Sequence, residues 1–382
     1  MQNFPKRLAD KLSDRTRSGS LRALRQSGSL IDFSSNDYLG FARSAGIFAA
    51  AQHIVEQNSL SNGATGSRLI SGNHGFYTEA ESLIATFHGA ESALIFNSGY
   101  DANVGFFSSV PQRNDIVLYD EYCHASIRDG IRLSGAKNIK FAHNDLYDLR
   151  SKLENFQSAE NEVYVATESV FSMDGDSPNL RELANLCSEH RARLVIDEAH
   201  AVGTFGDRGE GFVTASNLQD QVFANIVTFG KALGCHGAAV LGSADLRDYL
   251  INFARSFIYS TALPPHAIAT VIAAYQHLTI SEADRNKLFQ NIEFFNTCAT
   301  QFGISDKIIA GNSAIKCVVI PGNETVRKIS RLFIDNNFDI RAILSPTVPS
   351  GQERLRICIH SYNSQAEIEE VLRLLAIFVK QE

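Results

Sequence analysis

The chain has 382 residues, of which 44% are hydrophobic and 20% are charged, a balance typical of a globular protein. This length exceeds one ordinary domain core, so a large domain and a smaller one are expected. A formal net charge of −7 argues against a nucleic-acid-binding protein, because such proteins usually carry a basic surface.

The sequence contains no pattern typical of a membrane span or a metal site. No run of about 18 apolar residues is present, and the charged N-terminal segment lacks the apolar core of a signal peptide. The six cysteines form no CxxC pair and have no zinc-site spacing with histidine. Scattered thiols favour a reducing compartment, so we expect a cytoplasmic protein with no membrane partner and no metal.

The first 48 residues are expected to form an N-terminal arm, followed by a large domain at 49–263. From about residue 90, short β-rich runs alternate with segments of helix length, and the segment 179–190 keeps its apolar residues at helical spacing. The expected strands cover residues 92–96, 115–119, 163–167, 194–196 and 226–229. This alternation predicts an α/β domain with a mainly parallel sheet wrapped by helices.

A sixth run, at 237–242, follows the fifth after a very short connection. A parallel crossover needs about a dozen residues or more, so this strand is expected to be antiparallel to its predecessor. Pro264 and Pro265 then interrupt the chain. Beyond them we expect a helical region at about 266–302, strands at 314–320 and 354–359, and a final helix at about 365–380. These elements predict a small C-terminal α+β domain at 264–382.

Polar residues follow two of the expected strands. Open α/β sheets bind ligands beyond the carboxyl ends of their strands, and Asp197 and His200 follow the strand at 194–196. A carboxylate buried there stays ionised only with a cationic partner, although Asp197 could instead cap a helix. Ser172, in the polar turn after 163–167, is expected in the same crevice unless that turn is an ordinary polar loop.

Two further strand ends supply candidate groups. Gly99 lies in a glycine turn that opens a helical segment, and such a turn presents backbone N–H groups to an anion such as phosphate. A glycine turn alone is weak evidence for a phosphate site. His124 follows the strand at 115–119, where a histidine can be functional or purely structural.

Lys231 follows the strand at 226–229. A phosphate-binding Walker A loop would need a glycine at position 225 and Ser or Thr at position 232, where the chain has Asn225 and Ala232. A surface lysine is possible, but the flanking residues are mostly apolar. A desolvated lysine can form a Schiff base with a carbonyl. Together with an aspartate for a pyridine nitrogen and a phosphate-binding turn, it predicts a site for pyridoxal 5′-phosphate (PLP).

The sequence resembles, over nearly its whole length, the α-oxoamine synthases, which are fold-type I PLP enzymes that condense an amino acid with an acyl-CoA. The resembling segments are 33–40, 65–72, 124–126, 141–145, 170–176, 197–200, 228–231, 258–261, 346–349 and 354–356. The resemblance implies a mostly parallel seven-stranded sheet with one antiparallel strand, and a homodimer with shared active sites.

Within the family, the segments 141–145, 170–176 and 346–349 favour members that join L-alanine to pimeloyl-CoA or a pimeloyl-carrier protein in biotin biosynthesis. The alternatives are sister reactions of serine or glycine with another acyl-CoA. A non-catalytic homologue would lack Lys231, and a simple binding module would not gather this many polar groups at strand ends.

The resemblance also implies roles for individual residues around the cofactor ring. Lys231 forms the Schiff base, Asp197 pairs with the pyridine nitrogen, and His124 stacks on the ring face. Ser172 and His200 contact the ring hydroxyl.

The resemblance further implies the phosphate and substrate contacts. Backbone N–H groups of Gly99 and Tyr100, with Thr228, hold the phosphate, and Ser260 and Thr261 reach it from the neighbouring subunit. The substrate-binding residues are Arg22, Asn36 and Arg356, the last as anchor for the amino-acid carboxylate. Arg354 shares a strand face with Arg356, and we expect it to be a solvated rim charge.

Overall fold

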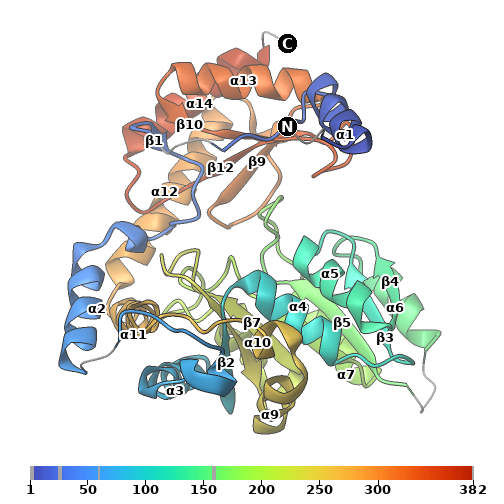
Figure 1. Ribbon diagram of the computed structural model, residues 1–382. Coiled ribbons are helices and arrows are strands. Elements are labelled where there is room, and N and C mark those ends of the chain that lie inside the picture. The colour runs from blue at the N-terminus through green and yellow to red at the C-terminus, as the bar shows by residue number, and fades with distance from the viewer. Residues whose placement is uncertain (1–3, 25–27, 59–60, 157–160, 381–382) are drawn as a thin grey trace. The chain divides into compact units, whose positions relative to one another are not determined.

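The computed structural model describes residues 4–24, 28–58, 61–156 and 161–380 (Figure 1). The chain forms two compact units. The large unit comprises Asn36–Ser172 and Ser177–Asn286, and the small unit comprises Met1–Ser35, Met173–Asp176 and Lys287–Glu382. Within the described residues, every helix is too short or too polar to cross a lipid bilayer.

The large unit is built on a seven-stranded sheet with the order β2-β8-β7-β6-β5-β3-β4. β8 runs antiparallel to both of its neighbours, and the other neighbouring pairs are parallel. The predicted fold class, a mostly parallel sheet with one antiparallel strand, is therefore confirmed. The strands are β2 (Ser92–Phe96), β3 (Ile116–Asp120), β4 (Lys137–Phe141), β5 (Val163–Glu168), β6 (Arg193–Asp197), β7 (Ala224–Thr228) and β8 (Ala238–Gly242).

Alternating residues of the central strands enter two hydrophobic clusters, one on each face of the sheet. In β3, Val117 belongs to one cluster and Leu118 to the other. Helices α4 (Gly99–Ser109), α5 (Ala125–Ser134) and α9 (Ala244–Phe253) contribute to the first cluster, and α6 (Leu146–Glu154) and α7 (Leu180–Glu189) contribute to the second. Burial on both faces explains why these strands appear in the sequence as continuous apolar runs.

Two elements differ from the sequence expectations. β4 was not expected, because it is an edge strand whose Lys137, Asn138 and Lys140 are exposed and give no apolar pattern. The expected helical region at 266–302 consists of two helices, α11 (Pro265–Leu278) and α12 (Glu282–Gln301). A short connection at 279–281 separates them.

The small unit contains a three-stranded antiparallel sheet with the order β11-β12-β9. Its strands are β9 (Ile315–Val319), β11 (Arg341–Ile343) and β12 (Arg354–Cys358). Its helices are α1 (Lys6–Arg17), α13 (Asn323–Asp335), α14 (Gln365–Lys380) and the later turns of α12. The mixture of antiparallel strands and helices agrees with the predicted α+β character.

The compact units do not coincide with the domain limits expected at 48/49 and 263/264. β1 (Ile31–Asp32) pairs in parallel with β10 (Phe338–Asp339), which ties this N-terminal segment to the small unit. Helix α11 packs against α2 (Ala45–Gln57) and α3 (Gly75–His88), so it belongs to the large unit.

Candidate active site

The carboxyl ends of four neighbouring parallel strands form one edge of the large sheet. β7, β6, β5 and β3 end in Thr228, Asp197, Glu168 and Asp120, and all four residues are buried. Glu168 and Asp197 are register partners in adjacent strands. This edge is where open α/β sheets usually bind their ligands, and here it carries a row of polar groups.

Asp197 is held by a side chain that the sequence did not single out. Its Oδ2 accepts a hydrogen bond of 2.8 Å from Asn103 Nδ2, and its Oδ1 accepts one of 2.9 Å from the Ala199 backbone N–H. Turns follow Asp197, and the next described helix is α8 (Phe212–Ala215). The helix-cap alternative for Asp197 is therefore wrong, and its carboxyl group is oriented by Asn103 instead.

His124 lies close to Asp197 and Lys231. It precedes α5, and its Nδ1 lies 2.7 Å from Ser126 Oγ, which accepts a hydrogen bond of 3.0 Å from Asn103. The residue is open to solvent on one side. Burial of its other side lowers its pKa, an effect that the nearby Asp197 opposes and the Lys231 charge reinforces. The structure thus brings these three predicted residues together.

His200 is linked to an N-terminal tyrosine. Its Nδ1 lies 2.8 Å from the hydroxyl of Tyr38, which in turn donates a hydrogen bond of 3.1 Å to Asn36 Oδ1. Tyr38 is buried and comes from the segment 33–40. Asn36 and His200 are therefore neighbours across this tyrosine, a link that strand-end reasoning did not predict.

Lys231 lies in the tight connection between β7 and β8. The Cys235 backbone N–H donates to the Phe229 carbonyl over 2.7 Å, and the Gly234 N–H donates to the Lys231 carbonyl over 2.9 Å. Gly234 has φ of +63°, and a Cβ there would lie 2.1 Å from the Ala42 nitrogen. The loop therefore needs this glycine, and it leaves Lys231 half-buried rather than on an open surface.

The glycine turn after β2 meets the end of β7. Helix α4 begins at Gly99, and a Cβ on Gly99 would lie 2.7 Å from Thr228 Cγ2. The Oγ1 atom of Thr228 is buried and has no hydrogen-bond partner in the protein. The Tyr100 side chain is exposed and donates to Asp129 Oδ2 over 2.7 Å. The first N–H groups of an α-helix lack intrahelical partners. The Thr228 hydroxyl, which has no protein partner, therefore lies beside the first N–H groups of α4.

The remaining predicted residues lie at several places. Ser172 follows β5 and donates its backbone N–H to Glu168. Ser260 is half-buried, and the Thr261 carbonyl accepts a hydrogen bond of 2.7 Å from Asn97 Nδ2 of the same chain. Arg22 is exposed in the small unit.

Arg354 and Arg356 both lie on β12 of the small unit but have different surroundings. Arg354 is only 2% exposed, and its guanidinium group pairs with Asp174 and donates to the carbonyls of Met173 and Gln352. The expectation that Arg354 is a solvated rim charge is wrong, because the segment at Met173–Asp176 covers it. Arg356 donates to Cys358 Sγ over 3.0 Å.

Comparison with known proteins places this geometry in a family. The family model described as aminotransferase class I and II matches residues 29–375. The 8-amino-7-oxononanoate synthase of Emericella nidulans is 39% identical, with 100% of this chain and 98% of that protein covered. The protein of the same name from Geotalea daltonii is also 39% identical, with 90% and 86% covered.

Solved structures agree with this assignment. A variant of serine palmitoyltransferase from S. paucimobilis, with a bound PLP–myriocin aldimine, superposes with a TM-score of 0.89 at 26% identity, over 98% of this chain and 97% of that one. The 8-amino-7-oxononanoate synthase of Francisella tularensis gives a TM-score of 0.79 at 28% identity, over 92% and 98%. The chain belongs to the aminotransferase class I and II family and is a PLP-dependent acyltransferase of its α-oxoamine synthase branch.

Proposed function

We propose that this chain catalyses the decarboxylative condensation of L-alanine with a pimeloyl thioester, giving 8-amino-7-oxononanoate, CO₂ and the free thiol in biotin biosynthesis. The observation that supports this most strongly is the 39% identity, over the whole chain, to the synthase of that name from Emericella nidulans. The thioester carrier is coenzyme A or a carrier protein.

The residues at the edge of the large sheet fit PLP. Thr228 Oγ1 is a buried hydroxyl oxygen with no protein partner, and a Cβ at position 99 would lie only 2.7 Å from the Thr228 methyl group. The Thr228 hydroxyl and the N–H groups of Gly99 and Tyr100 would hold the phosphate, as helix N-termini commonly do. When bound, PLP supplies an aldehyde carbon that amines attack and a ring that withdraws electrons.

Four side chains would hold the cofactor ring. The Asp197 carboxylate, oriented by Asn103, would accept a hydrogen bond from the protonated pyridine nitrogen. His124 would cover one face of the ring. Ser172 and His200 would contact the ring hydroxyl, with His200 oriented through its contact of 2.8 Å with Tyr38.

Lys231 would do the proton transfers. Its Nζ would hold the cofactor covalently in the absence of substrate, and the amine would remove the proton from Cα of the bound L-alanine. The same amine would return a proton to this carbon once CO₂ has left. The tight hydrogen-bonded loop at Phe229–Cys235 would limit how far Nζ can move between these two tasks.

Arg356 would anchor the alanine carboxylate. Arg354 is committed to Asp174 and to two backbone carbonyls, so it has little capacity left for a substrate. A planar guanidinium group suits two-point binding of a carboxylate. Arg22 and Asn36 would line the substrate site.

We further propose that the enzyme is a cytoplasmic homodimer with shared active sites. Ser260 and Thr261 of one subunit would reach the phosphate bound by the other. The related serine palmitoyltransferase structures favour one alternative, a sister reaction that uses serine or glycine with another acyl thioester.

A substrate comparison with the purified holoenzyme tests the proposed function. Release of free thiol from pimeloyl-CoA should require L-alanine and should be much slower with serine, with glycine, or with palmitoyl-CoA. Lys231→Ala should lose turnover while keeping its far-ultraviolet circular dichroism. Faster turnover with serine and palmitoyl-CoA would reject the proposal in favour of the sister reaction.

A further inference from the structure

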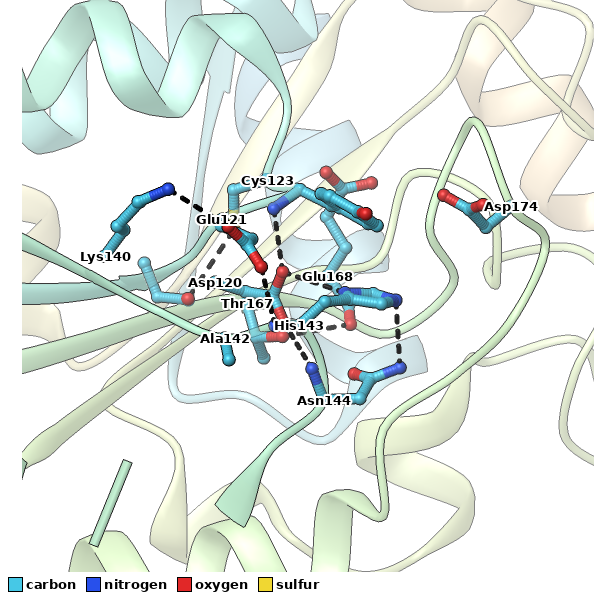
Figure 2. A network of polar contacts seen from close by, with 12 residues as sticks. Asp120, Glu121, Cys123, Lys140, Ala142, His143, Asn144, Thr167, Glu168 and Asp174 are labelled. Atoms are coloured by element: carbon cyan, nitrogen blue, oxygen red, sulfur yellow. Dashed lines mark hydrogen bonds and ion pairs between the residues drawn. The ribbon is translucent and has the colours of Figure 1, made fainter. Parts of the chain in front are cut away.

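The segment Phe141–Asp145 resembles a family motif, but the proposed chemistry uses none of its residues. It follows the edge strand β4, and its His143 lies beside the loop that leads to His124. Figure 2 shows the polar network around His143, Asp120 and Asn144. All of these residues belong to the large unit.

Asp120 joins two loops through its two carboxyl oxygens. Its Oδ1 accepts hydrogen bonds from the Tyr122 backbone N–H, over 2.8 Å, and from His143 Nδ1, over 2.9 Å. Its Oδ2 accepts a hydrogen bond of 2.9 Å from the Asn144 backbone N–H. The Asp120 side chain is completely buried, so these bonds are shielded from water. The end of β3 is thereby fixed to the loop after β4.

The His143 ring contacts an aromatic residue from each of two cofactor-binding loops. It stacks on Tyr122, with ring centroids 4.4 Å apart and an interplanar angle of 28°. It also meets Phe171 edge to face, at 4.5 Å and 87°. Tyr122 is two residues before His124, and Phe171 immediately precedes Ser172. One imidazole therefore packs against the neighbours of two residues proposed to contact the cofactor ring.

Glu168 ties the same two loops at the level of the backbone. Its Oε1 accepts the His124 N–H over 2.6 Å, and its carboxyl group also accepts the Ser172 N–H. Burial, and then the neighbouring Asp197, raise the pKa of Glu168 well above its usual range. A neutral carboxyl group adds no second negative charge beside Asp197. The backbones of His124 and Ser172 are thus fixed, and the His143 ring fixes the side chains next to them.

We propose that His143, oriented by Asp120, is a positioning residue that sets the ring-face histidine His124 and the ring-hydroxyl serine Ser172 through Tyr122 and Phe171. This inference rests on the proposed cofactor contacts of His124 and Ser172. Its effect is geometric, because His143 acts through the residues it packs against. Loss of the imidazole removes the packing between the two loops and lets both of them shift.

The test compares three variants of the PLP-loaded enzyme. His143→Asn retains a donor for Asp120 and removes the ring, whereas His143→Phe retains a ring and removes the donor. Lys140→Ala is the matched control, since Lys140 is 66% exposed and pairs with Glu121 in the same region. The readouts are the circular dichroism of the visible cofactor band, kcat and KM for L-alanine, and the melting temperature.

We expect His143→Asn to change the cofactor dichroism and to lower kcat by about 10-fold, because small misplacements at a distance slow chemistry. His143→Phe should recover much of both signals, and Lys140→Ala should match the wild type. The positioning role is wrong if His143→Asn lowers only the melting temperature. It is also wrong if His143→Phe keeps the wild-type melting temperature but shows the same changes in cofactor dichroism and kcat as His143→Asn. The dichroism needs no substrate, so it tests this inference even if the proposed substrates fail.

Discussion

Asn103 Nδ2 lies 2.8 Å from Asp197 Oδ2 and connects a residue of helix α4 to the carboxyl end of β6. The same nitrogen lies 3.0 Å from Ser126 Oγ, which contacts His124. One buried amide thus orients the residues proposed for the nitrogen and the face of the cofactor ring.

Asn103→Ala should weaken cofactor binding and lower kcat/KM by about 10-fold, the usual effect of losing one hydrogen bond to a carboxylate. Asn103→Asp should be worse, because it replaces the amide donor with a further carboxyl group beside Asp197. Titration of the apoenzyme with PLP and steady-state kinetics measure both effects. Asn138→Ala, on the exposed face of β4, is the control and should be unchanged. Wild-type affinity in Asn103→Asp would contradict this role.

Gly99→Ala should raise the dissociation constant for PLP. The new methyl group would lie 2.7 Å from Thr228 Cγ2, and overpacking of this kind corresponds to a loss of about 10-fold or more in affinity. The double variant Gly99→Ala, Thr228→Ser removes the clashing methyl group, keeps the hydroxyl and should recover most of the binding.

Absorbance titration of the apoenzyme gives these constants directly. Gly75→Ala is the control, because an added Cβ there contacts nothing within 4 Å. If the double variant binds PLP no better than Gly99→Ala, the close approach of Gly99 and Thr228 is not the cause.

Arg354→Met should destabilise the protein by about 3 kcal/mol, because it leaves the buried Asp174 without its partner. The double variant Arg354→Met, Asp174→Asn should be more stable than Arg354→Met alone, since no buried charge is then unpaired. Urea unfolding measures both differences. Arg373→Met, which breaks the exposed pair with Glu370, should unfold like the wild type. A wild-type unfolding midpoint for Arg354→Met would show that the pair contributes nothing to stability.

Glu198 makes stability depend on pH. Burial raises its pKa to about 7, against hydrogen bonds from the Asn225 side chain and the N–H groups of Val213 and Phe212. Because the folded-state pKa exceeds the value of 4.5 for the unfolded chain, the stabilisation by the protonated form is fully present below pH 4.5. It is lost as the pH rises through about 7.

Glu198→Gln keeps a neutral side chain at every pH. Relative to the wild type, its unfolding free energy should be similar at pH 5 and higher by about 3 kcal/mol at pH 8. Chemical unfolding at the two pH values measures this difference, with the exposed Glu154→Gln as the control. Parallel pH profiles for the wild type and Glu198→Gln would refute the assignment.

The strand ends of the large sheet were predictable because parallel strands place their carboxyl ends on one edge. Asp197, His124 and Lys231 follow predicted strands, and the structure places them close together. Asn103 was missed because it faces the edge from a helix, where nothing in the local sequence distinguishes it from a surface asparagine. Tyr38 was missed for a related reason, since its contact with His200 joins segments far apart in the chain.

Burial in the small unit could not be deduced from periodicity. Alternation along β12 places Arg354 and Arg356 on one face, but it cannot indicate which of them another segment covers. Asp174 and Met173, which surround Arg354, come from a loop far away in the sequence. Long-range contacts of this kind cover Arg354, and no pattern in the local sequence reveals them.

The reversed direction of β8 has a consequence for the order of folding. Its first residue, Ala238, pairs with Phe96 at the end of β2 and with Thr228 at the end of β7. In the folded sheet, β8 lies between β2 and β7, two strands far apart in the chain, and so sets the distance between the turn at Gly99 and Thr228. Non-local pairing of this kind is slow, because the entropy of closing a long loop must be overcome first. The proposed phosphate site therefore requires β2, β8 and β7 to be paired, and PLP binding would report that this part of the sheet has assembled.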